Sequence, residues 1–279
     1  MIALQDVLRR IHDLPSLPAV VVELLSSMEQ DDLDVQALAA KITLDQSLTA
    51  KTLRLANSSF YGMQSKVTSM QQAIAVLGFR SIRTLVTACS VTGSFVPGPG
   101  IHFDFQKFWR HSVATALTAK ALAPRLGSNP ETAFTAGLLH DLGTLVLATS
   151  FPAQHDAVLA YRRVHDCYLI EAERAVLGID HAMVGSALAA YWKFPANMQA
   201  AVASHHDIAP ADAVSLPLLI HVANIMAHAL DLSADDDDLV PPLPQHVWRT
   251  LALSDATCVA VFRETELAFQ EMCQILVGA

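Results

Sequence analysis

The sequence predicts an all-α fold, and three observations support that fold class. Apolar residues recur at helical spacing along most of the chain, as in the series Val35, Leu38, Ala39 and Ile42. No run of alternating polar and apolar residues predicts a strand, and no Asn-Gly or Asp-Gly pair predicts a hairpin turn. Of the 279 residues, 52% are hydrophobic and only 16% are charged, so the helices must bury much of their surface.

The first 100 residues are expected to form an N-terminal helical subdomain. Asp34 is a suitable N-cap for a helix that begins at Val35, and Gly78 stands where a later helix should end, since glycine tolerates positive φ. Residues 96–100 read VPGPG, and two prolines with two glycines cannot continue a helix. We therefore assign residues 101–279 to a second helical subdomain.

The second subdomain begins with the apolar segment 105–122, which is predicted to be a helix. Asn129-Pro130 then offers an N-cap followed by proline at the first helical position. An acidic, proline-rich stretch, Ser233–Pro244, is expected to form an exposed loop, because adjacent like charges repel and favour solvent. A final amphipathic helix is predicted at 259–276.

Composition excludes several classes of protein. Disordered chains carry fewer apolar residues, and no apolar run approaches the roughly 18 residues of a membrane span. The N-terminus lacks the basic and apolar regions of a signal peptide. A net charge of −9 argues against binding to nucleic acid, which needs clustered Lys and Arg. We expect a cytoplasmic protein with four buried free thiols, at Cys89, Cys167, Cys258 and Cys273.

Histidine is the unusual feature of this chain, which has 12 of them. Four predicted helices each present histidine, or a His-Asp or His-His pair, beside small residues. Inward side chains from several helices are how bundles build metal sites, and imidazole with carboxylate suits Fe, Zn, Mn or Ni. The candidate metal ligands are His111, His140, Asp141, His181, His205 and His206.

A purely structural interpretation also fits these residues. A histidine on an apolar helix is often a core residue bonded to a backbone carbonyl, and a His-His pair at a helix end can be solvated. His-Asp hydrogen bonds would then hold the bundle together without metal. We expect the remaining histidines considered to be surface or capping residues: His12, His102, His155, His165, His228 and His246.

Several sequence blocks resemble a known family. GLLHDLG, HSVATAL about 30 residues upstream, GIDHAMVGSALAAYW and the later HHD are similar to the HD superfamily. LPSLPAVVVELL, ITLDQSLTAKTLRLANSSFYG and TSMQQAIAVLGFRSIRTLV narrow the resemblance to the HDOD family, which is related to the HD-GYP phosphodiesterases. The resemblance covers about residues 5–230. It implies an N-terminal helical subdomain and an HD-like bundle.

The resemblance to HD-GYP proteins implies two metal positions that share Asp141. One position, which we call the four-ligand site, is intact: Asp141, His181, His205 and His206. The other, the incomplete site, keeps His111, His140 and Asp141 but has Asn224 where the pattern has an aspartate. Lys107 stands one helical turn before His111, and the GYP motif is absent. Because Asn224 is neutral and Lys107 is cationic, we expect at most one divalent metal.

The expected function is a non-catalytic signalling module that binds receiver, kinase or cyclic-di-GMP-related domains. Phe60–Tyr61 is a candidate docking element, with core packing as the alternative. The alternative function is a metal-dependent HD-type phosphohydrolase acting on a nucleotide or cyclic dinucleotide, with Lys107, Asn224 or His111 near the phosphate. The sequence leaves open the partner, the input signal, homo-oligomer formation and membership of a longer response regulator.

Overall fold

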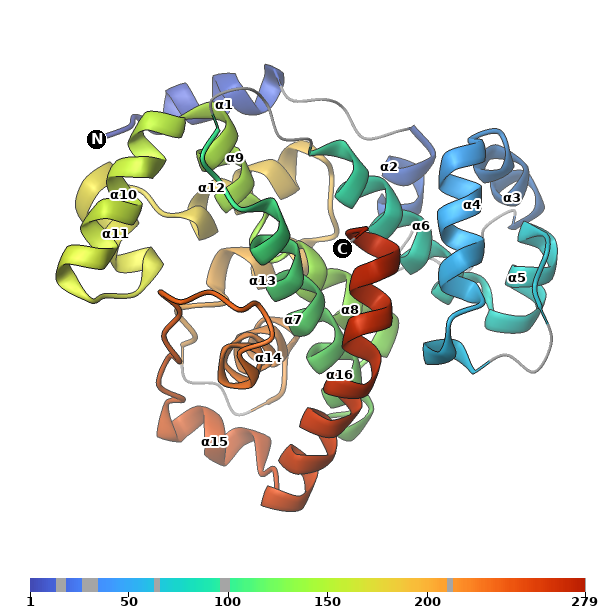
Figure 1. Ribbon diagram of the computed structural model, residues 1–279. Coiled ribbons are helices and arrows are strands. Elements are labelled where there is room, and N and C mark those ends of the chain that lie inside the picture. The colour runs from blue at the N-terminus through green and yellow to red at the C-terminus, as the bar shows by residue number, and fades with distance from the viewer. Residues whose placement is uncertain (14–18, 27–34, 63–65, 96–100, 210–212, 279) are drawn as a thin grey trace.

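The structure is a computed structural model that describes residues 1–279 except 14–18, 27–34, 63–65, 96–100, 210–212 and 279. Over the described residues it consists of helices and loops without any strand, which confirms the all-α prediction (Figure 1). The predicted N-cap Asp34 and the VPGPG stretch lie outside the described residues, as do the side chains of Val35 and Leu38.

The helices are α1 (Leu4–Asp13), α2 (Ala19–Ser26), α3 (Val35–Thr43), α4 (Gln46–Ala56), η1 (Ser59–Tyr61), α5 (Met70–Leu77), α6 (Phe79–Ser94), α7 (Phe105–Arg125), α8 (Pro130–Leu139), α9 (Leu142–Ser150), α10 (Pro152–His165), α11 (Leu169–Leu177), α12 (His181–Tyr191), α13 (Ala196–Ser204), α14 (Leu216–Leu230), α15 (Gln245–Leu251) and α16 (Asp255–Leu276).

Helix α7 is the centre of the bundle and packs against α8, α14 and α16. Its buried face is rich in small residues, including Ala114, Ala116 and Ala119, which let neighbouring helices approach closely. Larger side chains such as Trp109 and Val113 fill the remaining space. Burial of this apolar surface is the main driving force for the fold.

The N-terminal helices α2 to α6 gather beside the bundle, and α6 connects the two by packing against α8 (Figure 1). Gly78 has a φ of 81° between α5 and α6, as its predicted place at a helix end requires. Helix α1 behaves differently, because it packs against α9 and α12. The amide of Ile2 donates to the carbonyl of Leu177 at 2.8 Å, which fixes α1 to the bundle.

The predicted C-terminal helix is α16, and it joins the N-terminal helices to α7. The carboxylate of Glu271 accepts a hydrogen bond from the amide of Ser59 at 2.9 Å, at the start of η1. On the other side of α16, the ring of Phe269 is buried beneath the guanidinium of Arg110 on α7, at 4.9 Å.

In the described ranges, no helix by itself is both apolar and long enough to cross a membrane; one bent combination, Pro130–Ser150 with Pro152–His165 at 115°, meets that test. The four cysteines are free thiols. Cys89 and Cys273 are buried as expected, whereas Cys167 and Cys258 are half-buried.

Candidate metal centre

The ends of several helices bring the predicted ligands together. His111 lies within α7, His140 and Asp141 occupy the break between α8 and α9, and His181 is the first residue of α12. His205 follows the last residue of α13, and His206 comes directly after it. Residues at helix ends converge here because α8, α9, α12 and α13 start or stop at one place in the bundle.

Two glycines allow these helices to come so close. A Cβ at Gly143 on α9 would lie 1.9 Å from the backbone oxygen of His181, so α9 and α12 touch backbone to backbone. A Cβ at Gly137 on α8 would lie 2.9 Å from the Cα of Ala116 on α7. The first contact places Asp141 beside His181, and the second places His140 beside α7.

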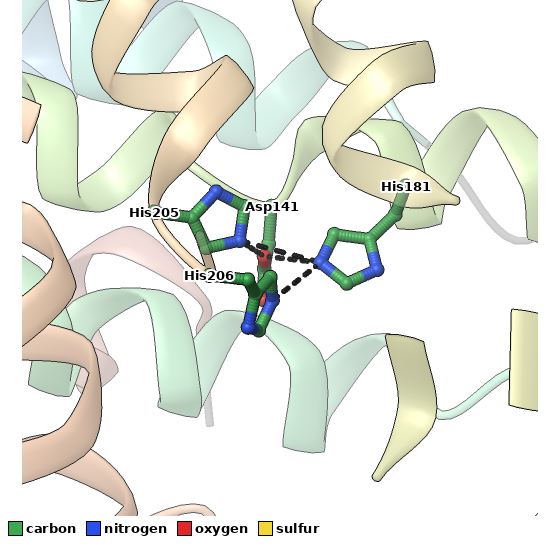
Figure 2. Close-up of side chains that lie close together, drawn as sticks. All are labelled: Asp141, His181, His205 and His206. Carbon is green, nitrogen blue, oxygen red and sulfur yellow. Dashed lines mark hydrogen bonds and ion pairs between the residues drawn. The ribbon is translucent and has the colours of Figure 1, made fainter. Parts of the chain in front are cut away.

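Asp141 lies at the centre of the four-ligand site, with the three histidines directed toward it (Figure 2). Its Oδ1 is 3.1 Å from Nε2 of His205 and 3.4 Å from Nε2 of His181. Nε2 of His181 is also 2.8 Å from Nε2 of His206. Atoms bound to one ion at about 2.1 Å lie about 3.0–3.4 Å apart, so these spacings fit shared coordination.

The outward ring nitrogens of these histidines are already bonded. Nδ1 of His181 donates to Glu173 at 2.6 Å, and Nδ1 of His205 donates to the carbonyl of Val202 at 2.8 Å. Nδ1 of His140 donates to the carbonyl of Gly137 at 2.7 Å. These bonds direct each Nε2 inward, and a metal ligand requires that this nitrogen carry no proton.

Two buried atoms that face the centre lack a hydrogen bond. Oδ1 of Asp141, in the four-ligand site, and Nε2 of His140, in the incomplete site, make no hydrogen bond with any described residue. Buried polar atoms are normally paired, so the Asp141 oxygen points to a missing ligand in the four-ligand site. The donor set, which is imidazole nitrogens around a shared carboxylate, suits a divalent transition metal. The residues present therefore fit the metal that the histidine pattern predicts.

The charges in the site also favour a cation. Burial opposes ionisation of Asp141, but the surrounding histidines outweigh it and hold the pKa of Asp141 well below its usual value. Burial likewise opposes a charge on His181, yet the carboxylates of Glu173 and Asp141 raise the pKa of His181 to about 9. Protonated His181 thus supplies positive charge in the metal-free site, and an ion must displace that proton.

The incomplete site is arranged differently. Oδ2 of Asp141 is 3.4 Å from Nε2 of His140 and 3.7 Å from Nε2 of His111. Nε2 of His111 also contacts Oδ1 of Asn224 at 2.9 Å, which occupies the nitrogen that would bind an ion. Burial lowers the pKa of His111 to about 4 and that of His140 to about 3, so both rings are neutral near pH 7.

The charge of Lys107, which lies near the incomplete site in the sequence, is paired with the acidic loop. Its ammonium is 3.6 Å from Oδ1 of Asp235 in the acidic loop. Lys107 and Asn224 nevertheless line the same cavity of about 620 Å³ as the four-ligand site. A cavity of this size is typical of small-molecule sites.

Three residues near the centre were not predicted from the sequence. His221 on α14 lines the cavity and donates through Nδ1 to the carbonyl of His205 at 2.7 Å. Glu173 is fully buried and accepts hydrogen bonds from both the backbone and the ring of His181. Arg162 also lines the cavity. Glu173 is recognisable as a functional residue only because its charged side chain is buried, and the sequence does not reveal that burial.

Three expectations, two about single histidines and one about the acidic loop, were wrong. His155 is 3% exposed, so it is a core residue, and His228 is half-buried and bonded to Asp238 at 2.8 Å. The acidic loop is not simply solvated, because most of its aspartates pair with cations. Phe60–Tyr61 is half-buried, and the ammonium of Lys120 on α7 lies 4.6 Å from the Phe60 ring centre, which agrees with the packing alternative; a docking role for this pair stays a prediction.

Comparison with known proteins now assigns the family. The HDOD domain model matches residues 14–208, which is more than half of the chain. The chain belongs to the HDOD family. The HDOD match includes the N-terminal helices together with the centre up to His205 and His206.

Solved structures share the HDOD fold over almost the full chain. One is described as a "putative phosphohydrolase" from Shewanella amazonensis SB2B, with 27% identity, a TM-score of 0.76, and coverage of 97% of this chain and 98% of that one. Another is an HDOD domain protein of unknown function from Geobacter sulfurreducens, with 23% identity, a TM-score of 0.76, and coverage of 99% and 98%.

A curated relative from Treponema pallidum (strain Nichols), described as an uncharacterized protein, is 25% identical over 216 residues. The match covers 77% of this HDOD chain but only 42% of that protein. The chain therefore spans less than half the length of this relative.

Proposed function

We propose that this HDOD protein is a regulatory module whose helical bundle holds one divalent metal ion at the four-ligand site. The observation that carries the proposal is the convergence of three histidine Nε2 atoms and one carboxylate oxygen around one point. Such an arrangement places nitrogen lone pairs against one another unless a proton or a metal lies between them.

The chain's own residues prepare this site. Glu173 fixes the His181 ring, the Val202 carbonyl fixes the His205 ring, and both keep a lone pair directed at the ion. Outer hydrogen bonds of this kind typically change metal affinity by about 10–100-fold. A bound divalent ion would act as a Lewis acid and would lower the pKa of bound water. Ligand type alone does not choose among Fe, Zn, Mn and Ni.

One ion rather than two is proposed because the incomplete site lacks a second carboxylate. Asn224 is neutral, and it uses Nε2 of His111 as its hydrogen-bond partner. Hydrolysis of phosphodiesters by a pair of metals uses both ions, one for each of the attacking and leaving oxygens. A bundle with one ion is better suited to sensing or binding, and the partners we propose are receiver, kinase or cyclic-di-GMP-related domains.

Metal content of purified protein tests this proposal. We expect about one equivalent of a transition metal per wild-type chain by mass spectrometry, and less than about a tenth of that in His181→Ala. The matched control is His165→Ala, which removes an exposed histidine outside the cluster and should keep the metal. Wild-type protein that stays metal-free after reconstitution with each of the four metals would contradict the proposal.

A metal-dependent phosphohydrolase is the second candidate, and one observation favours it. The four-ligand site opens into a cavity that Lys107 and Arg162 also line, so a phosphate could reach both an ion and cations. The Shewanella structure that shares 27% identity carries a phosphohydrolase name, which agrees with this candidate. Phosphate release from a nucleotide panel with added Mn or Fe, compared with Asp141→Ala, decides the matter. Equal rates in the two proteins would remove it.

A further inference from the structure

The acidic segment, Asp235–Asp238, folds back onto α7 and α10 in the stretch between α14 and α15 (orange in Figure 1). Asp237 Oδ2 accepts from Nε of Arg163 at 2.7 Å, and Asp235 pairs with Arg162 at 3.5 Å. Asp235 also pairs with Lys107 at 3.6 Å. Three of the four aspartates, which would repel one another, are thus held by cations from two helices.

These cations line one cavity but differ in exposure: Arg162 is the most buried, whereas the Arg163 side chain is 65% exposed. Lys107, Arg162 and Arg163 belong to the lining of the 620 Å³ cavity, as does the four-ligand site. The Arg162 side chain is 11% exposed, and its Nε is buried without a partner among the described residues. Surface ion pairs contribute little to stability, but a guanidinium removed from water needs an anion in contact with it.

The same geometry suits a phosphate group. Guanidinium groups present planar pairs of N–H donors that match carboxylate and phosphate oxygens equally well. The aspartate carboxylates therefore lie where the oxygens of a phosphorylated ligand would bind. Asp236 differs from its neighbours, because its side chain is fully exposed and its contact with the Lys107 ammonium is 3.9 Å long.

We infer that Lys107, Arg162 and Arg163 form a binding site for a phosphate-bearing ligand, and that the acidic segment occupies this site until such a ligand displaces it. The segment is a competitor built into the chain. Affinity for the ligand is then reduced by the fraction of molecules in which the segment is bound.

Displacement of the segment would also change the surroundings of the metal centre. Asp238 accepts from Nδ1 of His228 at 2.8 Å, and the His228 ring lies 4.4 Å, centre to centre, from the ring of His111. The segment thus contacts the incomplete site through one histidine. Ligand binding at the cations and the environment of His111 are linked through this contact.

Inorganic pyrophosphate, titrated calorimetrically into metal-free full-length protein, tests the inference. We expect at least about tenfold tighter binding in a variant that carries Asp235→Asn, Asp237→Asn and Asp238→Asn, because these amides keep the shape of the segment but not its charge. Adding Arg162→Gln to that variant should weaken binding at least about tenfold. Equal affinity of the wild type and the triple variant, or no effect of Arg162→Gln, would overturn the inference.

A matched pair of single substitutions separates local competition from net charge. Asp237→Asn and Asp236→Asn change the charge equally within the same segment, but only Asp237 bonds to Arg163. We expect Asp237→Asn to tighten pyrophosphate binding several-fold and Asp236→Asn to change it by less than about twofold. Equal effects would show that net charge alone is responsible, which contradicts a displaced competitor.

Wild-type protein supplies a test that depends on no variant. Amide hydrogen exchange of residues 233–240 should become faster when saturating pyrophosphate is added, since the segment leaves its cations. Unchanged or slower exchange there would show that the segment is not displaced. Because these experiments omit metal, they can fail while the metal proposal holds, and metal content can fail while these succeed.

Discussion

The four-ligand site and the incomplete site share Asp141, yet they differ in the hydrogen bonds that their histidine ring nitrogens make. In the four-ligand site the rings of His181 and His205 are bonded outward through Nδ1, so their Nε2 atoms face the point where an ion would lie. In the incomplete site the Nε2 of His111 is bonded inward to Asn224. Proximity alone does not make a histidine available to an ion: the direction of the second hydrogen bond of each ring decides which nitrogen is available.

The largest effect should come from the backbone contact that forms the four-ligand site. Gly143→Ala places a methyl group 1.9 Å from the His181 carbonyl oxygen, which belongs to rigid backbone. We expect a loss of about 3 kcal/mol or more in the free energy of unfolding, measured by urea denaturation of metal-free protein.

Gly137→Ala is the matched control on the side of the incomplete site. Its methyl group would lie 2.9 Å from the Cα of Ala116, a milder overlap. Alanine also favours a helix over glycine by about 1 kcal/mol, which offsets part of the cost. We expect a net loss of about 1 kcal/mol, and a loss equal to that of Gly143→Ala would contradict this ranking of the two contacts.

A smaller effect is expected from Glu173→Gln, which tests the outward bonding directly. Glutamine keeps the shape of the side chain but removes the charge that holds Nδ1–H of His181. Metal affinity should fall about 10–100-fold, measured by competition with a chelating dye. Metal-free protein should lose thermal stability as well, because protonated His181 then lacks the buried carboxylate with which it pairs.

Glu171→Gln provides the control for that experiment. Glu171 lies on α11 one half-turn from Glu173 but is exposed, and it bonds to the amide of Tyr168 instead of a histidine. Its replacement should leave metal affinity within about twofold of the wild type. If both variants bind metal like the wild type, Glu173 does not position His181.

Much of the fold and all of the proposed ligands could be predicted from the sequence. Helical periodicity revealed buried positions such as Ala39 and Ile42, because periodicity reports which face of a helix is apolar. The His-Asp and His-His pairs indicated the candidate ligands. Glu173 and His155 could not be found in this way, because a lone polar residue in a helix looks the same whether it faces solvent or the core.

The acidic segment is a second case in which local sequence did not predict burial. Consecutive aspartates predict solvent exposure when only the local sequence is considered. Lys107 lies about 130 residues earlier and Arg162 about 75 earlier, so their contacts with Asp235 depend on the tertiary fold. Local pattern thus predicted the location of the loop but not its burial or its partners.

The difference between the four-ligand site and the incomplete site can be tested by adding the missing carboxylate. Asn224→Asp restores a carboxylate beside His111 and Asp141, which would supply the charge that a second ion needs. We expect metal content to rise from about one toward two equivalents per chain, measured by mass spectrometry after reconstitution. Metal-free protein should lose thermal stability, because two buried carboxylates then lie close together without a cation between them.

Asn197→Asp is the control, since it makes the same change of charge at an exposed position on α13. It should leave both metal content and stability unchanged. A single equivalent of metal in Asn224→Asp would mean that the missing carboxylate does not limit the second ion. The restriction would then lie in His111 or in the cations near the cavity. That result would mean that the two sites differ because of their surroundings and not because of their ligands. Lys107 and the acidic segment would then be the next residues to substitute.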